Sequence, residues 1–152
     1  MLGLMSAGAP VAMESAGPLR PRPYLLAKEV PQLMARPSVR GRHLPLRQFV
    51  KDWYVPSADR AEMVADPLEA DVALGDAVRI ATVVHALCDS ESMAVPSWVF
   101  DYRFEDDEML VEQVPWHSAL GACERREAPA ACLWHRCWFG NGFFEVLGVH
   151  VR

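Results

Sequence analysis

Apolar residues recur at helical spacing in the middle of the chain, most regularly over residues 76–92. The apolar positions there are Ala77, Val78, Ile80, Ala81, Val84, Leu87 and Cys88. Intervals of three, four and seven residues place these side chains on one broad face of a helix. Asp76 suits the cap of this helix, because its carboxylate can accept hydrogen bonds from the first N–H groups. The pattern predicts the strongest helix of the chain here.

A second apolar pattern follows Pro45, a residue that suits the first turn of a helix. Four large side chains share one face of this predicted helix: Phe49, Val50, Trp53 and Tyr54. Pro56 ends it, and residues 59–65 predict another helical turn before the extended Asp66-Pro67 dipeptide. The ordered domain is therefore expected to begin near His43.

Beyond residue 92 the predicted elements are shorter. Pro96 ends any continuation of the long helix, and residues 98–100 form a bulky apolar segment. Residues 118–126 have a helical pattern, and Pro129 favours a new helix start because its missing N–H would be unpaired there.

The end of the chain has the pattern of a β-hairpin. Residues 137–139 have strand character, residues 140–142 read Gly-Asn-Gly, and a second apolar run covers residues 143–147. Asn-Gly supplies the positive φ values of a tight turn. The fold class predicted is mainly α, a small helical bundle with a short C-terminal β-hairpin.

Residues 1–42 differ from the rest in composition. They hold six of the twelve prolines, which disfavour long regular elements, although one short helix is expected around residues 25–34. Met1 to Met13 carries no basic residue, unlike a secretory signal peptide. The expected organisation is a flexible Pro/Arg-rich leader over residues 1–42 and a single helical domain over residues 43–152.

Charge divides the chain in the same way. Residues 1–50 have seven Lys or Arg and two Glu, a net charge of +5, whereas the remainder has a net charge of −10. Phosphate repels such an acidic body, which argues against duplex binding by the folded domain. Contact of the basic leader with nucleic acid stays open as an alternative to a solvated tail.

The apolar runs and the cysteines bear on the compartment. No run approaches the roughly 18 apolar residues of a membrane-spanning helix, so no membrane partner is expected. Four unevenly spaced cysteines do not form a secreted disulfide framework. Reduced thiols in a cytoplasmic protein are the expectation.

Three of the cysteines suggest a zinc site. Cys123, Cys132, His135 and Cys137 have the spacing C-x8-C-x2-H-x-C, and three thiolates with one imidazole suit tetrahedral zinc. The spacing is not that of a standard finger or ribbon. Burial of these residues as small core side chains is the favoured interpretation, with zinc as the alternative; no cofactor is predicted.

The sequence offers only weak candidates for a group of catalytic residues. His85 and Cys88 lie three residues apart on one helix face, a spacing more typical of core packing than of a nucleophile and its base. The acidic residues Asp106, Asp107 and Glu108 suit a solvated helix start. Phosphate-binding glycine loops, nucleophile elbows and zinc-protease motifs are absent from the sequence. A non-enzymatic protein is expected.

Three blocks of sequence carry a family resemblance. They are residues 46–67 (LRQFVKDWY followed by ADRAEMVADP), residues 84–99 (VHALC to VPSWV), and residues 106–139, which include Pro115-Trp116 and EAPAACLWHRCWF. Together they resemble an uncharacterised bacterial domain with PxWV, PWF and ESPAAFRRHNIFV-like elements, associated with toxin–antitoxin genes and XRE-type helix-turn-helix proteins. The resemblance implies a small, mainly helical regulatory or antitoxin-like partner protein.

The chain departs from that family pattern in several places. His117 replaces an aromatic residue, Cys132 replaces Phe, and Leu133-Trp134 replaces an arginine pair. Residues 1–43 contain no convincing helix-turn-helix, which argues against autonomous DNA binding.

A protein partner, such as a cognate toxin, is therefore the leading hypothesis. Trp and Arg dominate interface energetics, and a proline before a tryptophan keeps the segment extended. The partner-binding candidates are Trp98, Trp116, His117, Arg125 and Arg126. The alternatives are a transcriptional regulator that contacts DNA through its basic leader, and a small zinc-binding protein.

Overall fold

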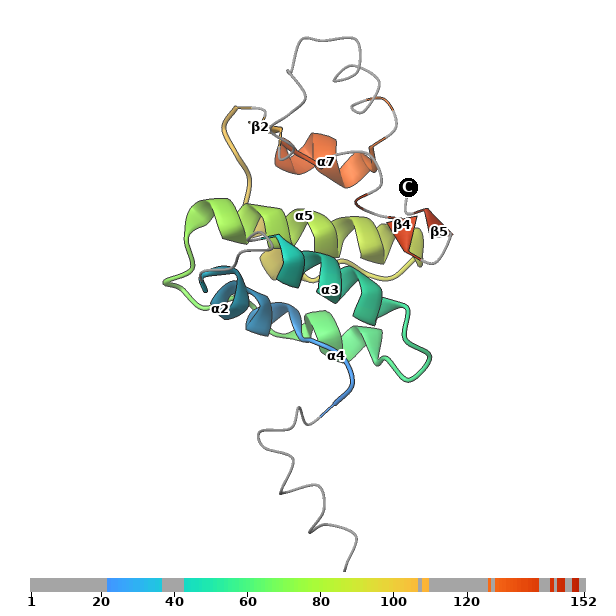
Figure 1. Ribbon diagram of the computed structural model, residues 1–152. Helices are drawn as coiled ribbons and strands as arrows, with labels where there is room; N and C mark the ends of the chain where they lie inside the picture. The colour runs from blue at the N-terminus through green and yellow to red at the C-terminus, as the bar shows by residue number, and fades with distance from the viewer. Residues whose placement is uncertain are drawn as a thin grey trace, which may run out of the picture.

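Helix α5 (Leu74–Ser90) runs through the middle of the molecule, with helices on both sides (Figure 1). Above it lies α7 (Ala130–His135), and below it lie α2 (Val30–Met34), α3 (Leu44–Trp53) and α4 (Arg60–Ala65). This computed structural model describes residues 22–36, 43–106, 108–109, 126, 128–139, 143, 145–146 and 149–150. The described part is mainly helical, which confirms the predicted fold class.

The long helix is confirmed, with two corrections. It begins at Leu74 with Ala73 as its N-cap, so Asp76 lies in the first turn and is not the cap. Its carboxylate is still favourable there, because the helix dipole is positive at this end. The predicted buried face is too narrow: Thr82, Val83 and Ala86 are buried as well, because neighbouring helices cover α5 from two sides.

Helices α3 and α4 also confirm the sequence patterns. Pro45 lies in the first turn of α3, and the buried side of α3 includes Phe49 and Trp53, both fully buried. The side chain of Asp59 caps α4 by accepting a hydrogen bond of 3.1 Å from the backbone N–H of Glu62. Pro in a first helical turn and Asp at a helix cap depend only on the backbone of neighbouring residues, so no distant partner is needed for either.

The segment 22–36 is folded, so the expected flexible leader up to residue 42 is wrong there. It contains a 3-10 helix, η1 (Ala27–Glu29), followed by α2, as the short-helix prediction suggested. Six of its side chains belong to the core: Tyr24, Leu25, Leu26, Ala27, Val30 and Met34. Pro31 does not oppose this fold, since it lies in the first turn of α2. Residues 1–21 and 37–42 lie outside the described part.

The buried side chain of Asp52 on α3 holds the segment 22–36 against the rest of the domain. Its carboxylate accepts a 2.9 Å hydrogen bond from the backbone N–H of Leu25 and a 2.8 Å bond from Nε2 of Gln48. Asp52 is only 3 % exposed, and a carboxylate is that deeply buried only when its oxygens are paired. The polar contact thus fixes where the apolar segment enters the core.

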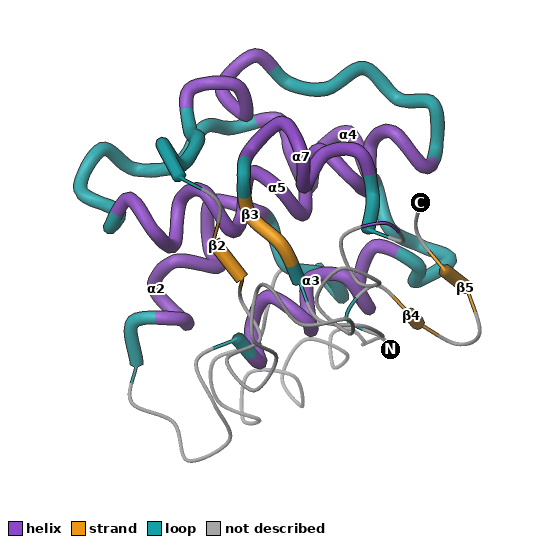
Figure 2. The backbone as a smooth tube through the Cα atoms, turned by 90° about the horizontal axis from the view of Figure 1, so that it is seen from above, coloured by secondary structure: helices purple, strands orange, loops and turns teal. Residues whose placement is uncertain are grey.

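Strands are short and pair differently from the predicted hairpin. β2 (Glu108–Met109) and β3 (Cys137–Trp138) are parallel neighbours, and β4 (Glu145–Val146) pairs antiparallel with β5 (Val149–His150) (Figure 2). Among the described residues, strand 137–138 thus pairs with 108–109 and not with the predicted terminal run, although a two-stranded antiparallel pair does lie near the C-terminus. The helix predicted over residues 118–126 lies outside the described part except for Arg126.

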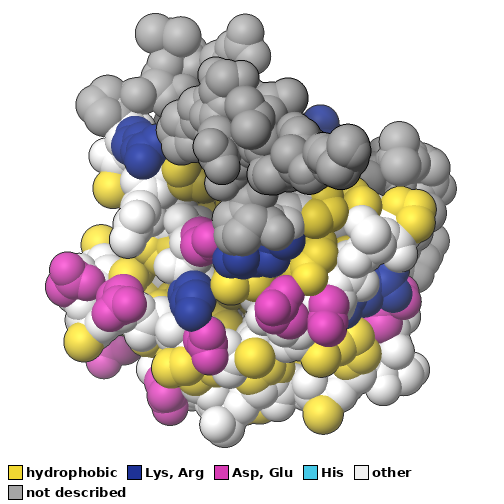
Figure 3. Space-filling model, turned by 90° about the horizontal axis from the view of Figure 1, so that it is seen from below, with side chains coloured by type: hydrophobic (Ala, Val, Ile, Leu, Met, Phe, Trp, Pro, Cys, Tyr) yellow, Lys and Arg dark blue, Asp and Glu magenta, His cyan; other side chains and the backbone are white. Residues whose placement is uncertain are grey.

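The 3-10 helix η2 (Ser97–Asp101) follows α5 along the chain, with Trp98 and Val99 buried and Phe100 exposed. On the underside, acidic and basic side chains of the described residues alternate with apolar ones (Figure 3). No helix within the described ranges has the length and apolar character that a membrane crossing requires.

Candidate functional site

Large apolar side chains are exposed where Phe100 of η2 contacts Trp134 of α7. Leu133 is 67 % exposed, Phe100 44 % and Trp134 38 %. The rings of Phe100 and Trp134 meet edge to face with centroids 5.1 Å apart. We call this surface, together with the neighbouring Arg103 and Arg136, the α7 patch.

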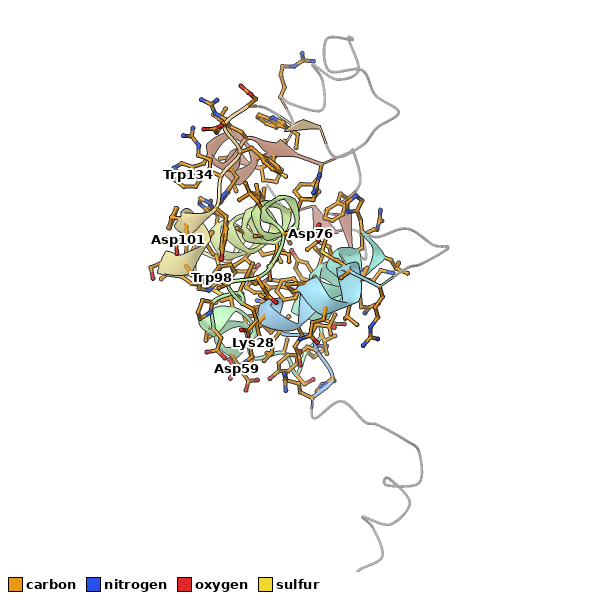
Figure 4. The ribbon with its side chains drawn as sticks, turned by 90° about the vertical axis from the view of Figure 1, so that its left-hand side faces the viewer. Lys28, Asp59, Asp76, Trp98, Asp101 and Trp134 are labelled. Carbon is orange, nitrogen blue, oxygen red and sulfur yellow. The ribbon has the colours of Figure 1, made fainter. Side chains whose placement is uncertain are left out.

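The patch exists because α7 is short and uses only one side for packing. Ala131, Cys132 and His135 are buried toward α5, whereas Leu133 and Trp134 point outward. Trp134 lies above the level of α5 and Trp98 below it (Figure 4). The two tryptophans therefore have different environments, and only Trp134 contributes to the exposed surface.

His135, the residue after Trp134, makes hydrogen bonds that join α7 to α5. Nδ1 of His135 is 2.7 Å from the carbonyl oxygen of Tyr102, and Nε2 of His135 is 2.9 Å from Nδ1 of His85. The carbonyl only accepts, so His135 donates from Nδ1 and, in the neutral ring, accepts at Nε2. His85 must then donate from Nδ1. One tautomer of each ring is thereby fixed.

Both histidines are held in the neutral form that these hydrogen bonds require. Burial lowers the pKa of His135 to about 4, against the raising effect of the Tyr102 hydrogen bond. Burial also lowers the pKa of His85, and the carboxylate of Asp89, 3.5 Å from its Nε2, acts in the opposite direction. At neutral pH the pair is therefore an uncharged link between two helices.

The pairing of His85 with Cys88 considered from the sequence is not what the structure presents. His85 contacts His135, Phe100 and Trp134. Burial raises the pKa of the Cys88 thiol to about 11, so the reactive thiolate is scarce at neutral pH. This geometry suits packing of α5 better than nucleophilic chemistry.

Two arginines of the α7 patch are held by backbone carbonyl groups. Nε of Arg103 donates to the carbonyl oxygen of Trp134 at 2.6 Å, and its guanidinium lies 5.5 Å from the centroid of the Trp134 ring. Nη1 of Arg136 donates to the carbonyl oxygen of Glu105. Both arginines line one open depression, whose other described lining residues are Asp106, Ala130, Leu133 and Trp134.

The predicted interface residues are only partly found here. Trp98 is a correction: it is 6 % exposed and its Nε1–H donates to the carbonyl oxygen of Val64 at 2.9 Å, so it packs η2 against α4. Arg126 is exposed. Trp116, His117 and Arg125 lie outside the described residues.

The zinc alternative meets a structural obstacle at His135. Both of its ring nitrogens already have partners, so neither faces a metal ion. Burial raises the pKa of the Cys132 thiol, with nearby Cys137 adding to the effect, and a zinc ligand must be a thiolate. Cys123 lies outside the described residues, and the described ranges contain no cluster of three or more His, Cys, Asp or Glu that could hold a metal ion.

Sequence reasoning missed Phe100, Arg103, Leu133, Trp134 and Arg136. One signal for the patch was present, since Leu133-Trp134 stood out as a departure from an arginine pair in the family pattern.

Comparisons of the chain with protein-family models, with curated proteins and with solved structures give no match. The resemblance to toxin–antitoxin-associated domains therefore remains a hypothesis based on the quoted motifs.

Proposed function

We propose that this chain is a non-enzymatic, antitoxin-like or regulatory protein that binds a protein partner through the α7 patch. The observation that carries the proposal is the exposure of Leu133 and Trp134 on adjacent positions of a helix whose other side is buried. Exposed apolar side chains gathered around an aromatic pair are typical of interaction surfaces.

The patch has the composition and rigidity of an interface centre. Tryptophan and arginine are the residues that most often dominate binding energy, and Trp134 has Arg103 over its ring. The hydrogen bond between His135 and His85 holds the helix that carries Trp134. A surface that is ordered before binding loses less conformational entropy when the partner arrives.

The kind of partner is suggested by the sequence motifs. Their resemblance to toxin–antitoxin-associated domains favours a toxin encoded beside this chain, in the cytoplasm, where buried free thiols such as Cys88 and Cys132 stay reduced. An antitoxin of this type would neutralise its toxin by covering a surface and would need no catalytic group of its own.

Co-expression with the product of the adjacent gene tests the proposal. We expect the two proteins to copurify and the chain to restore growth of cells that express the toxin. The paired change Leu133→Ser and Trp134→Ala should abolish both effects. Leu74→Ser is the matched control, because Leu74 is 61 % exposed at the start of α5. Loss of binding in the control, or full binding by the double variant, would contradict the role of the patch.

A further inference from the structure

The two arginines of the α7 patch indicate which chemical group the partner presents to it. We infer that the depression beside Trp134 binds a carboxylate of a protein partner, next to an apolar side chain that packs on Leu133 and Trp134. This inference rests on the proposed function and narrows it, since it names the group that the partner must bring.

Within the described ranges, the guanidinium groups of Arg103 and Arg136 are oriented by hydrogen bonds but form no ion pair. Each donates one hydrogen bond to a backbone carbonyl, of Trp134 and of Glu105 respectively. In the part of the chain that the structure describes, neither pairs with a carboxylate. A guanidinium has five N–H donors in a fixed plane, so each arginine keeps donors for an incoming anion.

The backbone of Arg136 is a second, independent sign that its side chain matters. Arg136 caps α7 with φ 55° and ψ 39°, the left-handed conformation. Glycine is the usual residue at such a helix end, because a side chain is disfavoured there. An arginine at this position accepts a backbone cost that glycine would avoid, which is understandable if its guanidinium is needed in the depression.

The depression combines a charged side with an apolar side. Arg103 and Arg136 contribute two positive charges and Asp106 one negative charge, so the described lining is net positive in a chain of net charge −5. Leu133 and Trp134 supply the apolar wall. Arginine forms its strongest protein contacts with carboxylates, often through two parallel hydrogen bonds. An acidic residue beside an apolar one, on the surface of a partner protein, fits both sides.

A small probe can test this chemistry without the partner. N-acetyl-L-phenylalanine carries an aromatic ring and a carboxylate, and its amide carries the same ring without the charge. Binding to the full chain is followed by NMR at the indole N–H of Trp134, assigned with Trp134→Phe. We expect the carboxylate to bind about tenfold more tightly than the amide, because one charge-assisted contact is worth that factor.

Two variants separate binding from folding. Arg136→Gly should weaken binding of the carboxylate about tenfold while its urea midpoint is no lower than that of the wild type, because glycine removes the left-handed backbone cost. Arg103→Gln should weaken binding to a similar extent. Lys51→Gln, on exposed Lys51 of α3, is the matched charge control and should bind as the wild type does.

Three results would count against the inferred carboxylate site, and a fourth would contradict only the proposed partner. Equal binding of the amide and the carboxylate would show that the depression recognises only apolar groups, and the proposed partner binding would still stand. If Arg136→Gly binds the carboxylate as tightly as the wild type does, Arg136 is not part of the site. Tighter binding of a single-stranded thymidine oligonucleotide, with no response to the carboxylate, would assign the arginines to nucleic acid. A failure to copurify with the adjacent gene product, with the probe still bound, would contradict the proposed partner and not the carboxylate site.

Discussion

The two sides of α5 are packed in different ways. Below α5, helices α2 and α3 contact it, and α3 contributes fully buried apolar side chains such as Leu46, Phe49 and Trp53. Above α5, the six-residue helix α7 is joined to it by the His85–His135 hydrogen bond and by small buried residues such as Cys132. Burying a large apolar side chain contributes roughly 1.5–3 kcal/mol, so each of these side chains of α3 makes a large contribution to stability.

The difference shows how a short helix can present exposed apolar groups. The hydrogen bonds of His135 add to the packing of Ala131 and Cys132, since one ring reaches both Tyr102 and His85. Leu133 and Trp134 are then left for the surface.

The largest expected effect lies on the lower side. Trp53→Ala should reduce the free energy of unfolding by about 3–5 kcal/mol, because it opens a large cavity in a packed layer. Urea unfolding followed by circular dichroism measures this change. Leu44→Ala, on the same helix but 42 % exposed, is the control and should change stability far less. Similar losses in the two variants would contradict the contrast between core and surface.

The upper side should respond to pH. Folding depresses the pKa of His135 from 6.5 to about 4, so between these values the unfolded chain holds a proton that the folded chain lacks. The stabilisation is complete above about pH 6.5 and is lost as the pH falls towards 4, by about 3 kcal/mol at most. Unfolding free energies at pH 7 and 4.5 measure it. His135→Gln should show a smaller loss between the two pH values; an equal loss would assign the effect to other groups.

The attachment of residues 22–36 is expected to be the next most sensitive feature. Asp52→Ala removes the acceptor of the Leu25 N–H and leaves a buried donor unpaired, which costs about 1–3 kcal/mol. Hydrogen exchange should show faster exchange at Leu25 and in α2, with α5 less affected. Uniform acceleration through the whole molecule would mean that the segment does not open on its own.

The smallest effect on stability is expected in the patch itself. Leu133→Ser should change the free energy of unfolding by less than about 0.5 kcal/mol, since Leu133 is 67 % exposed. The same change should weaken partner binding, which separates the patch from the core. A loss comparable with that of Trp53→Ala would show that Leu133 supports the fold, and the proposed interface would lose its main observation.

How far the sequence predicts the structure depends on the range of each interaction. The long helix, the first turn of α3 with Pro45 and the Asp59 cap of α4 follow from spacing and backbone chemistry within a few residues. The same local reasoning was wrong for residues 22–36. Proline content suggested a flexible segment, whereas the buried carboxylate of Asp52, 27 positions from Leu25, holds it in the core.

The candidate site shows the same limit more strongly. The partner of His135 is His85, 50 positions away, and the partner of Arg103 is the carbonyl oxygen of Trp134, 31 positions away. Residue type and the preceding proline favoured Trp98 as an exposed contact, but its indole N–H donates to the carbonyl oxygen of Val64 and the ring is buried.

The sequence by itself determined the helical class and the approximate positions of the main helices, because these depend on periodicity and on bonds within a turn or two. Only the tertiary structure decided that both sides of α5 are covered, that residues 22–36 belong to the core, and that Trp134 is exposed while Trp98 is not. Burial depends on which distant segments meet, and no local pattern carries that information.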